Sequence, residues 1–346
     1  MTAMVSKAGS ATFNESALAA YRPRLPAGRP WVDYWYCYII DPAVGFFKIA
    51  FLSYLGERTD EQQRAYLHIA FFPLGGGFRE YDFHADRVSL DAGEDDCPYS
   101  FRFEVAGRAV ITESRIELTL PEAILVATLQ GAHDHYWNGC NPANGPFTPE
   151  SNSGPADASH WFIFTMGTQS DCEFRDAQNE HRGSGMAYIE RGWSSAAALG
   201  FINLVATGDR VRLMLVEGGK SAGRGGDVWA GKIDIGDHSL RLLPQPDDHR
   251  ATSEIDAVQG TVLLVVEQGP YRLELRSIAE LADFYDQITP SQTVFDGQLP
   301  VMKTMNAALD IALFRDGIVV ERAALPQSIL EFAGVSYRFV GQERGQ

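Results

Sequence analysis

The sequence predicts an all-β protein built of antiparallel barrels or sandwiches. Apolar residues recur with a period of two or in short continuous runs, and turn residues follow roughly every eight to twelve positions. Strand and helix patterns do not alternate along the chain, which argues against a parallel α/β sheet. The length of 346 residues corresponds to about two domains of ordinary size. We therefore expect two consecutive β domains.

The expected strands are separated by glycine, proline or aspartate. They span residues 34–40, 46–55, 65–72, 99–105, 115–120, 123–129, 161–166, 185–190, 201–206, 211–216, 261–267 and 271–275. One helix is expected over 277–287, because apolar residues there recur at three- and four-residue spacing behind Ser277, which can cap it. A second short helix near the C-terminus would still leave strands in large excess.

Composition and charge limit the classes of function. Apolar residues make up 45% of the chain and charged residues 21%, which is enough apolar material for a buried core. The formal net charge of −16 has the wrong sign for a nucleic-acid partner. The first 16 residues lack the apolar core of a signal peptide, and no later stretch of about 18 residues is free of charge. We expect a cytoplasmic protein that does not insert into membranes.

The first expected strand is unusually aromatic. Period-two alternation places Asp33, Trp35 and Cys37 on one face and three tyrosines, among them Tyr36, on the other. In a barrel that holds a ligand, such a strand supplies flat apolar surface together with hydroxyl or indole hydrogen-bonding groups. Trp35 and Tyr36 are therefore candidate substrate-binding residues. The alternative, of equal weight, is that they are ordinary core and surface aromatics.

A second group of candidates contains two histidines. His133 and His135 would point to the same side of a strand and could hold a metal, with His160 as the third ligand. The favoured alternative places His133, Tyr136 and Trp137 at the rim of a substrate pocket, where an imidazole orients a substrate oxygen. We expect neither a metal nor a cofactor.

The segment 185–193 contains the best candidate for catalysis. On a strand, Tyr188 and Glu190 share one face, and Ile189, Arg191 and Trp193 share the other. A carboxyl group beside a phenol in an apolar cavity would have a raised pKa and could donate a proton to an alkene or a carbonyl. We therefore predict Glu190 as a general acid with Tyr188 beside it. The alternative is a structural strut in which Glu190 pairs with an arginine.

These residues carry a resemblance to a known family. The pattern consists of His160-Trp161, followed about thirty residues later by Gly185-x-x-Tyr188-x-Glu190-x-x-Trp193. It resembles the group that contains tocopherol cyclase, carotenoid hydratase (hydroxyneurosporene synthase), the AttH-like proteins and the lipocalin-like Diels–Alderases. The aromatic strand 31–40 is similar to the first strand of the same group. Together the matches span roughly residues 30–205.

The resemblance implies two lipocalin-like (calycin) domains, 25–195 and 196–346, that bind a hydrophobic ligand within or between them. Members of the group act on terpenoid, carotenoid or polyketide substrates without a redox cofactor. The resemblance supports Glu190 as the general acid. As pocket or supporting residues it implies His160, Trp161 and Trp193.

One departure from the group concerns the residues after the acid. The group commonly continues with Asn-Trp-Gly and then Phe-Pro, whereas this chain has Arg191-Gly192-Trp193-Ser194 and no proline. The small residues that follow would leave room for a bulky ligand.

The expected function is that of a cofactor-independent cyclase, hydratase or isomerase for a hydrophobic small molecule of terpenoid or polyketide type. For a terpenoid, the faces of Trp35, Trp137, Trp161 and Trp193 would stabilise a carbocation. The main alternative is a carrier or sensor of a lipid-like ligand. A glycan-binding or glycan-hydrolysing protein fits less well, since hydrolysis needs two carboxylates and the sequence identifies only one good candidate.

Overall fold

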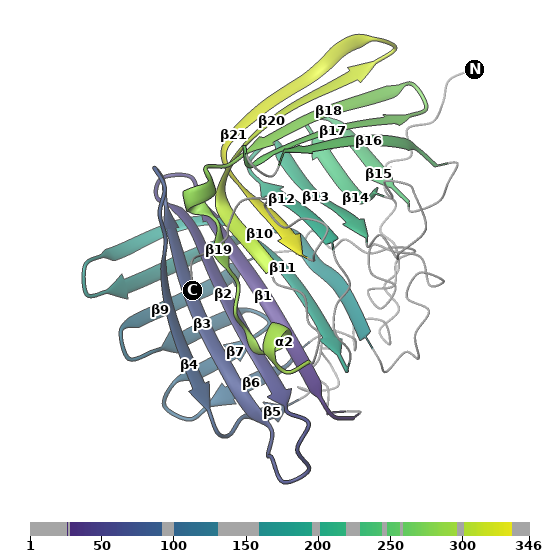
Figure 1. Ribbon diagram of the computed structural model, residues 1–346. Helices are drawn as coiled ribbons and strands as arrows, with labels where there is room; N and C mark the ends of the chain where they lie inside the picture. Colours follow the sequence, from purple (N-terminus) through teal and green to yellow (C-terminus); the bar gives the residue numbers. More distant parts are fainter. Residues whose placement is uncertain are drawn as a thin grey trace.

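Two antiparallel sheets make up nearly all of the described chain, which confirms the all-β prediction (Figure 1). The computed structural model describes Pro26 and residues 28–91, 100–130, 159–195, 201–218, 229–243, 248–256, 259–295 and 301–333. Within these residues, no helix is long and apolar enough to cross a membrane.

The first sheet has 11 strands in the order β4-β3-β2-β1-β11-β10-β9-β8-β7-β6-β5. The strands are β1 (Trp31–Asp41), β2 (Gly45–Leu55), β3 (Arg64–Pro73), β4 (Arg79–Ala85), β5 (Ser89–Asp91), β6 (Arg102–Val105), β7 (Ala109–Thr112), β8 (Arg115–Thr119), β9 (Ala123–Gln130), β10 (Ser159–Asp176) and β11 (Glu180–Ser194). Strand β1 pairs with β11, so the strands that come first and last along the chain lie side by side in the middle of this sheet.

The second sheet has 10 strands and repeats this plan, in the order β15-β14-β13-β12-β21-β20-β18-β17-β16, with β19 paired to β20. The strands are β12 (Phe201–Thr207), β13 (Val211–Gly218), β14 (Trp229–Ile235), β15 (His238–Leu242), β16 (Arg250–Asp256), β17 (Thr261–Gln268), β18 (Tyr271–Ile278), β19 (Tyr285–Asp286), β20 (Val301–Arg315) and β21 (Ile318–Ala333). Its first strand, β12, again pairs with its last, β21. The last strand of the first sheet, β11, ends at Ser194, and the first strand of the second, β12, begins at Phe201. The domain division 25–195 and 196–346 stays a prediction.

The helix expected over 277–287 is wrong. Strand β18 continues to Ile278, and only a 3-10 turn, η4 (Leu281–Asp283), and β19 follow before a single turn of α-helix, α2 (Pro290–Thr293). The apolar residues at helical spacing do not share one buried face: Leu281 is 38% exposed, whereas Tyr285 is buried and pairs with β20. Tertiary packing therefore overrides the local helical pattern.

Three apolar clusters hold the molecule together. The first core, inside the first sheet, includes Trp35 and Trp193, and the second core, inside the second sheet, includes Trp229. The third cluster, which we call the seam, joins residues of both sheets; it includes Tyr36 from β1 and Met214 from β13. Alternate residues of β1 thus face the first core and the seam.

Strand β2 is buried along its whole length. It lies between the first core and the seam, so both of its faces are covered. This explains the nearly continuous apolar sequence of 45–55, in which only Lys48 is charged.

A segment of the second half crosses onto the first sheet. Residues 279–295, which we call the strap, leave β18, form η4, β19 and α2, and place α2 against β1 and β2 (Figure 1). The strap therefore covers part of the seam face of the first sheet.

Candidate functional site

Titratable side chains gather on the face of the first sheet that points into the seam. Residues directly opposite each other on paired strands share a face, so the strand register defines two neighbouring rows. The first row, from β11 to β4, consists of Glu190, Tyr36, Ala50, His68 and Asp82, and the second of Tyr188, Tyr38, Lys48, Ala70 and Glu80.

Glu190 lies at one end of the first row with its side chain buried. Tyr188 Oη donates a hydrogen bond to Glu190 Oε2 at 3.0 Å, and the Trp161 side chain donates a second. Burial raises the pKa of Glu190 to about 7, although Lys303 and both hydrogen bonds favour the charged form. A substantial fraction of this carboxyl group is therefore protonated near neutral pH.

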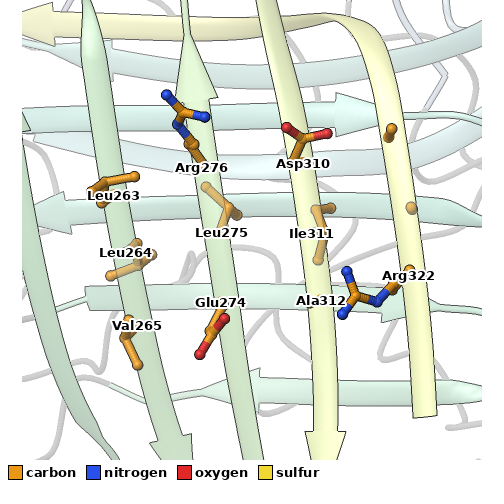
Figure 2. Close-up of a pocket in the computed structure, with 12 residues that line it drawn as sticks. Leu263, Leu264, Val265, Glu274, Leu275, Arg276, Asp310, Ile311, Ala312 and Arg322 are labelled. Atoms are coloured by element: carbon orange, nitrogen blue, oxygen red, sulfur yellow. The ribbon is translucent and has the colours of Figure 1, made fainter. Parts of the chain in front are cut away.

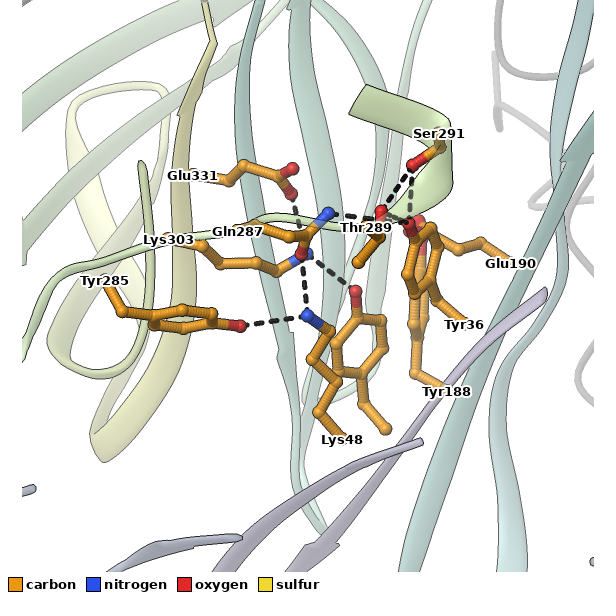
Figure 3. Close-up of polar contacts among 11 residues, drawn as sticks. Tyr36, Lys48, Tyr188, Glu190, Tyr285, Gln287, Thr289, Ser291, Lys303 and Glu331 are labelled. Atoms are coloured by element: carbon orange, nitrogen blue, oxygen red, sulfur yellow. Dashed lines mark hydrogen bonds and ion pairs between the residues drawn. The ribbon is translucent and has the colours of Figure 1, made fainter. Parts of the chain in front are cut away.

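Two buried lysines belong to the same group of polar side chains but differ in their partners (Figure 3). Lys303, on β20, donates to Glu331 Oε2 at 2.8 Å and to Tyr38 Oη at 2.6 Å. Lys48 donates to Gln287 Oε1 at 2.7 Å and to Tyr285 Oη at 3.0 Å, both on the strap. Lys303 is thus in an ion pair, whereas Lys48 has neutral acceptors.

The surroundings of Lys48 disfavour its charge. Its side chain has no exposed surface, and within the described chain it forms no ion pair. Burial, reinforced by the positive charge of Lys303, lowers the pKa of Lys48 to about 7. The amine therefore exchanges a proton readily near neutral pH.

The strap also binds Tyr36. The Tyr36 hydroxyl is 3.2 Å from Thr289 Oγ1 and 2.9 Å from Ser291 Oγ, at hydrogen-bonding distance from each. Burial raises the pKa of Tyr36 to about 12, so its phenol stays neutral. The hydroxyl groups and the amide of the strap thus supply the hydrogen-bond partners of Lys48 and Tyr36.

His68 and Asp82 form a dyad at the other end of the first row. His68 Nδ1 lies 2.7 Å from Asp82 Oδ1, and Tyr66 donates to the same oxygen. Burial would raise the pKa of Asp82, but the hydrogen bonds from His68 and Tyr66 outweigh it and lower the pKa. The carboxylate accepts, so we assign the ring hydrogen of His68 to Nδ1.

The second nitrogen of His68 is left as an acceptor. Burial lowers the pKa of His68 to about 4, with a further contribution from Lys48, so the imidazole is neutral at pH 7. Nε2 is buried and has no hydrogen-bond partner among the described residues. A buried nitrogen of this kind needs an explanation, because leaving such a group unpaired costs stability.

Trp35 and Trp193 lie on the opposite side of the sheet from Glu190. In the first core their rings enclose the Arg191 guanidinium, whose carbon is 4.4 Å from the Trp35 centroid and 4.8 Å from that of Trp193. Arg191 forms a fully buried ion pair with Asp33 at 2.8 Å. Arg191 therefore pairs with Asp33, across the sheet from Glu190.

The structure brings together some of the predicted site residues and not others. Glu190, Tyr188, Tyr36 and Trp161 meet at the seam. Only the backbone of His160 is placed, opposite Trp193. The remaining candidates lie outside the described residues: His133, Tyr136 and Trp137.

Sequence reasoning missed the lysines and the His68–Asp82 dyad. A signal existed for Lys48, because it is the single charged residue in an otherwise apolar strand. His68 gives a similar signal, because it is the single histidine in the apolar run 65–72, whereas Lys303 and Glu331 stand in mixed sequence.

The second sheet contains a separate depression of about 730 Å³. It is lined by consecutive residues of β17, β18, β20 and β21, with Leu264 and Leu275 belonging to the second core and Arg276 exposed (Figure 2). It shares no residue with the seam network. Among the described residues, no three His, Cys, Asp or Glu side chains gather as a metal site.

The described fold is that of the two-domain lipocalin-like proteins. Solved structures with this fold include an AttH-like protein from Nitrosomonas europaea, with 16% identity, a TM-score of 0.53, and coverage of 96% of this chain and 98% of that one. They also include kievitone hydratase from Nectria haematococca, with 10% identity, a TM-score of 0.51 and coverage of 92% of each chain. No protein-family model and no curated protein matches the chain. The likeness confirms the expected fold resemblance.

Proposed function

We propose that the protein is a cofactor-independent enzyme of the hydratase or lyase type, acting on a hydrophobic small molecule at the seam. The observation that carries the proposal is the Glu190 carboxyl group, buried at 5% exposure, with its pKa raised to about 7. A general acid works best when its pKa lies near the working pH. A solved structure of similar fold is named a hydratase, which supports the same class of reaction.

In the proposed reaction, the Glu190 O–H bond breaks and its proton goes to one carbon of a substrate double bond. The oxygen of water bonds to the other carbon, and the proton released by that water passes to a base. The reverse sequence eliminates water. An intramolecular hydroxyl in place of water gives cyclisation with the same proton transfers.

Tyr188 is a positioning residue in this proposal. Its hydroxyl donates to Glu190 Oε2 and so helps to orient the carboxyl group toward the substrate. Trp161 adds a second hydrogen bond and a flat apolar surface at the edge of the seam. Both groups limit the orientations available to the carboxyl group.

The test begins with native mass spectrometry and denaturing extraction of the purified protein to identify any bound molecule. That molecule, and a panel of prenylated and enone-bearing phenols, are then incubated with the protein in ¹⁸O-labelled water. We expect the wild type to incorporate or exchange label. Glu190→Gln should reduce the rate about a hundredfold or more.

The matched control is Glu254→Gln, which removes a carboxylate from an exposed position of β16. It should retain wild-type rates. A ligand bound and released unchanged by both wild type and Glu190→Gln would contradict the enzymatic proposal and identify a carrier.

A further inference from the structure

The aromatic faces of the seam are already occupied by ammonium groups. Lys303 Nζ lies 4.8 Å from the Tyr38 ring centroid, and Lys48 Nζ lies 5.3 Å from that of Tyr285. Both ammonium groups also lie over Tyr36, at 5.7 and 5.6 Å. A carbocation here would compete with two positive charges for the same rings and would be repelled by them. The seam therefore suits a reaction that develops negative charge.

Lys48 is the residue that would stabilise a negative charge developing on the substrate. Lys303 is neutralised by Glu331, but the acceptors of Lys48 are an amide oxygen and a phenol. Burying an ammonium group without a counter-charge is costly. A negatively charged substrate oxygen beside Lys48 would supply the missing counter-charge. Lys48 would therefore stabilise most strongly the reaction intermediate in which that oxygen carries the negative charge.

Gln287 indicates which chemical group fits this position. Its side-chain carbonyl oxygen accepts a hydrogen bond from Lys48 at 2.7 Å. A carbonyl oxygen of a substrate would accept the same hydrogen bond when the strap residue moves aside. The hydroxyls of Thr289 and Ser291 lie at hydrogen-bonding distance from Tyr36. A hydroxyl group of a substrate would take their place.

We propose that the seam binds substrates whose reacting double bond is conjugated to a carbonyl, such as α,β-unsaturated ketones and esters, and that Lys48 stabilises the oxyanion of their enolate. This inference rests on the proposed function and specifies its substrate class. It replaces the terpenoid carbocation expected from the aromatic residues.

The proton acceptor for this reaction is His68. Its Nε2 is unpartnered and buried, and Asp82 holds Nδ1 on the other side of the ring. His68 and Lys48 are diagonal neighbours on paired strands, and Glu190 lies in the same row as His68 with only Tyr36 and Ala50 between them.

The step balances as a conjugate addition. Water oxygen bonds to the β-carbon, the π pair of the double bond moves to form the enolate, and the carbonyl oxygen takes the negative charge beside Lys48. The water proton goes to His68 Nε2. Glu190 then donates its proton to the α-carbon as the carbonyl re-forms. Proton exchange with solvent returns one proton to Glu190 and removes one from His68.

The first experiment measures oxyanion binding without turnover. The probe is a hydrophobic nitrophenol that ionises near neutral pH, whose phenolate is an enolate analogue with a distinct absorption. We expect wild type to bind the phenolate at least about tenfold more tightly than the phenol, because a nearby positive charge lowers a bound acid's pKa by one or more units. Lys48→Met should abolish this preference, and Lys48→Arg should keep part of it.

Other ionisable side chains lie around Lys48, so the comparison is made at one pH and repeated at a second. They are Glu80, Asp82, His68, Tyr38, Tyr285, Lys303 and Glu331. The matched control is Lys232→Met on β14, which removes a lysine that forms an ion pair with Asp234. The control should bind the probe as wild type does. Equal phenolate binding by wild type and Lys48→Met would overturn the proposal.

A second experiment compares two substrates on unmodified protein, a comparison that does not depend on a variant that folds, and then repeats the measurement with His68→Gln. An aryl enone and the same carbon skeleton without the carbonyl are compared in ¹⁸O-labelled water. We expect hydration of the enone only, and a large loss in kcat with His68→Gln. Faster hydration of the isolated alkene would overturn this inference while leaving the Glu190 proposal intact.

Borohydride treatment in the presence of the enone adds a further check. We expect no covalent adduct on Lys48. A reduced adduct there would overturn the hydrogen-bonding role, because it would show that the amine attacks the carbonyl. Failure of every substrate to react would contradict the proposed function, whereas the nitrophenol measurement would still decide the role of Lys48.

Discussion

At Glu190, the cost of burying a charge exceeds the attraction of its neighbours. Lys303, Tyr188 and Trp161 all favour the carboxylate, yet burial raises its pKa from 4.5 to about 7. The positive charge of Lys303 is shared, because Lys303 already pairs with Glu331 at 2.8 Å. Glu190 therefore holds its proton where an isolated carboxyl group would have lost it.

This shift makes the stability of the protein depend on pH. A carboxyl group whose pKa is raised on folding contributes stability that is present below pH 4.5 and is lost as the pH rises to about 7. We expect Glu190→Gln to gain stability relative to wild type across that window, at up to about 1.4 kcal/mol per pH unit. Denaturant unfolding at a series of pH values measures the difference.

The control for this prediction is Glu254→Gln, which removes an exposed carboxylate from β16. Parallel pH curves for wild type and Glu190→Gln would contradict the raised pKa. Lys48 has the opposite sign: its lowered pKa makes stability rise between about pH 7 and 10.5. Because Lys48 is present in both proteins, its contribution largely cancels in the comparison.

At the scale of elements, β11 carries two different environments on its two faces. Tyr188 and Glu190 face the seam, whereas Ile189 and Trp193 face the first core. The period of two fixes this division, so a shift of one residue would exchange the faces. The register of β11 against β1 is therefore a requirement of the proposed site.

Gly185 helps to set that register. A Cβ added there would lie 2.1 Å from the backbone oxygen of Ile40, on the paired strand β1. We expect Gly185→Ala to push β11 away from β1, to cost about 1 to 3 kcal/mol of stability, and to lower activity by displacing Glu190. Thermal unfolding and the rate of label incorporation provide the two readouts.

The matched substitution is Gly208→Ala, where the added Cβ would meet its nearest atom at 3.4 Å, an ordinary contact. It should leave stability within about 1 kcal/mol of wild type and activity unchanged. If the two alanine variants were equally stable, the argument from close approach at Gly185 would be wrong.

At the scale of the whole molecule, the site exists only because the two sheets meet. The same strand plan is used twice, but the two sheets contribute different residues to the seam: Tyr36, Lys48 and Glu190 come from the first and Lys303 and Glu331 from the second. The strap adds the covering residues. The network cannot be assembled by either sheet alone.

Because the seam is buried, we expect the protein to unfold in a single cooperative transition. Met214→Glu would place a carboxylate in the seam, since Met214 has no exposed surface and belongs to that cluster. We expect this variant to unfold in two transitions, one for each sheet with its own core. Scanning calorimetry measures the number of transitions.

Leu263→Glu is the control, because Leu263 is 37% exposed on β17. It should retain the single transition. Two transitions in the wild type, or one in Met214→Glu with only a lower midpoint, would contradict the view that the seam couples the two sheets.

The sequence by itself determined the all-β class, the faces of β1 and β11, and the pairing of Tyr188 with Glu190. These follow from the period of two, which is a local property of each strand. It also suggested the pocket role of Trp35 and Trp193, but the structure places both rings around Arg191 in the first core.

Only the tertiary structure decided which residues lie opposite each face of these strands. Lys48 meets Gln287 and Tyr285, and Tyr38 meets Lys303, across more than 230 residues of chain in each case. Alternation predicts which side of a strand a residue occupies, but the partner on that side depends on how distant elements pack. For this reason the sequence could identify the carboxyl group, whereas its lysines, its histidine dyad and the strap that covers them required the fold.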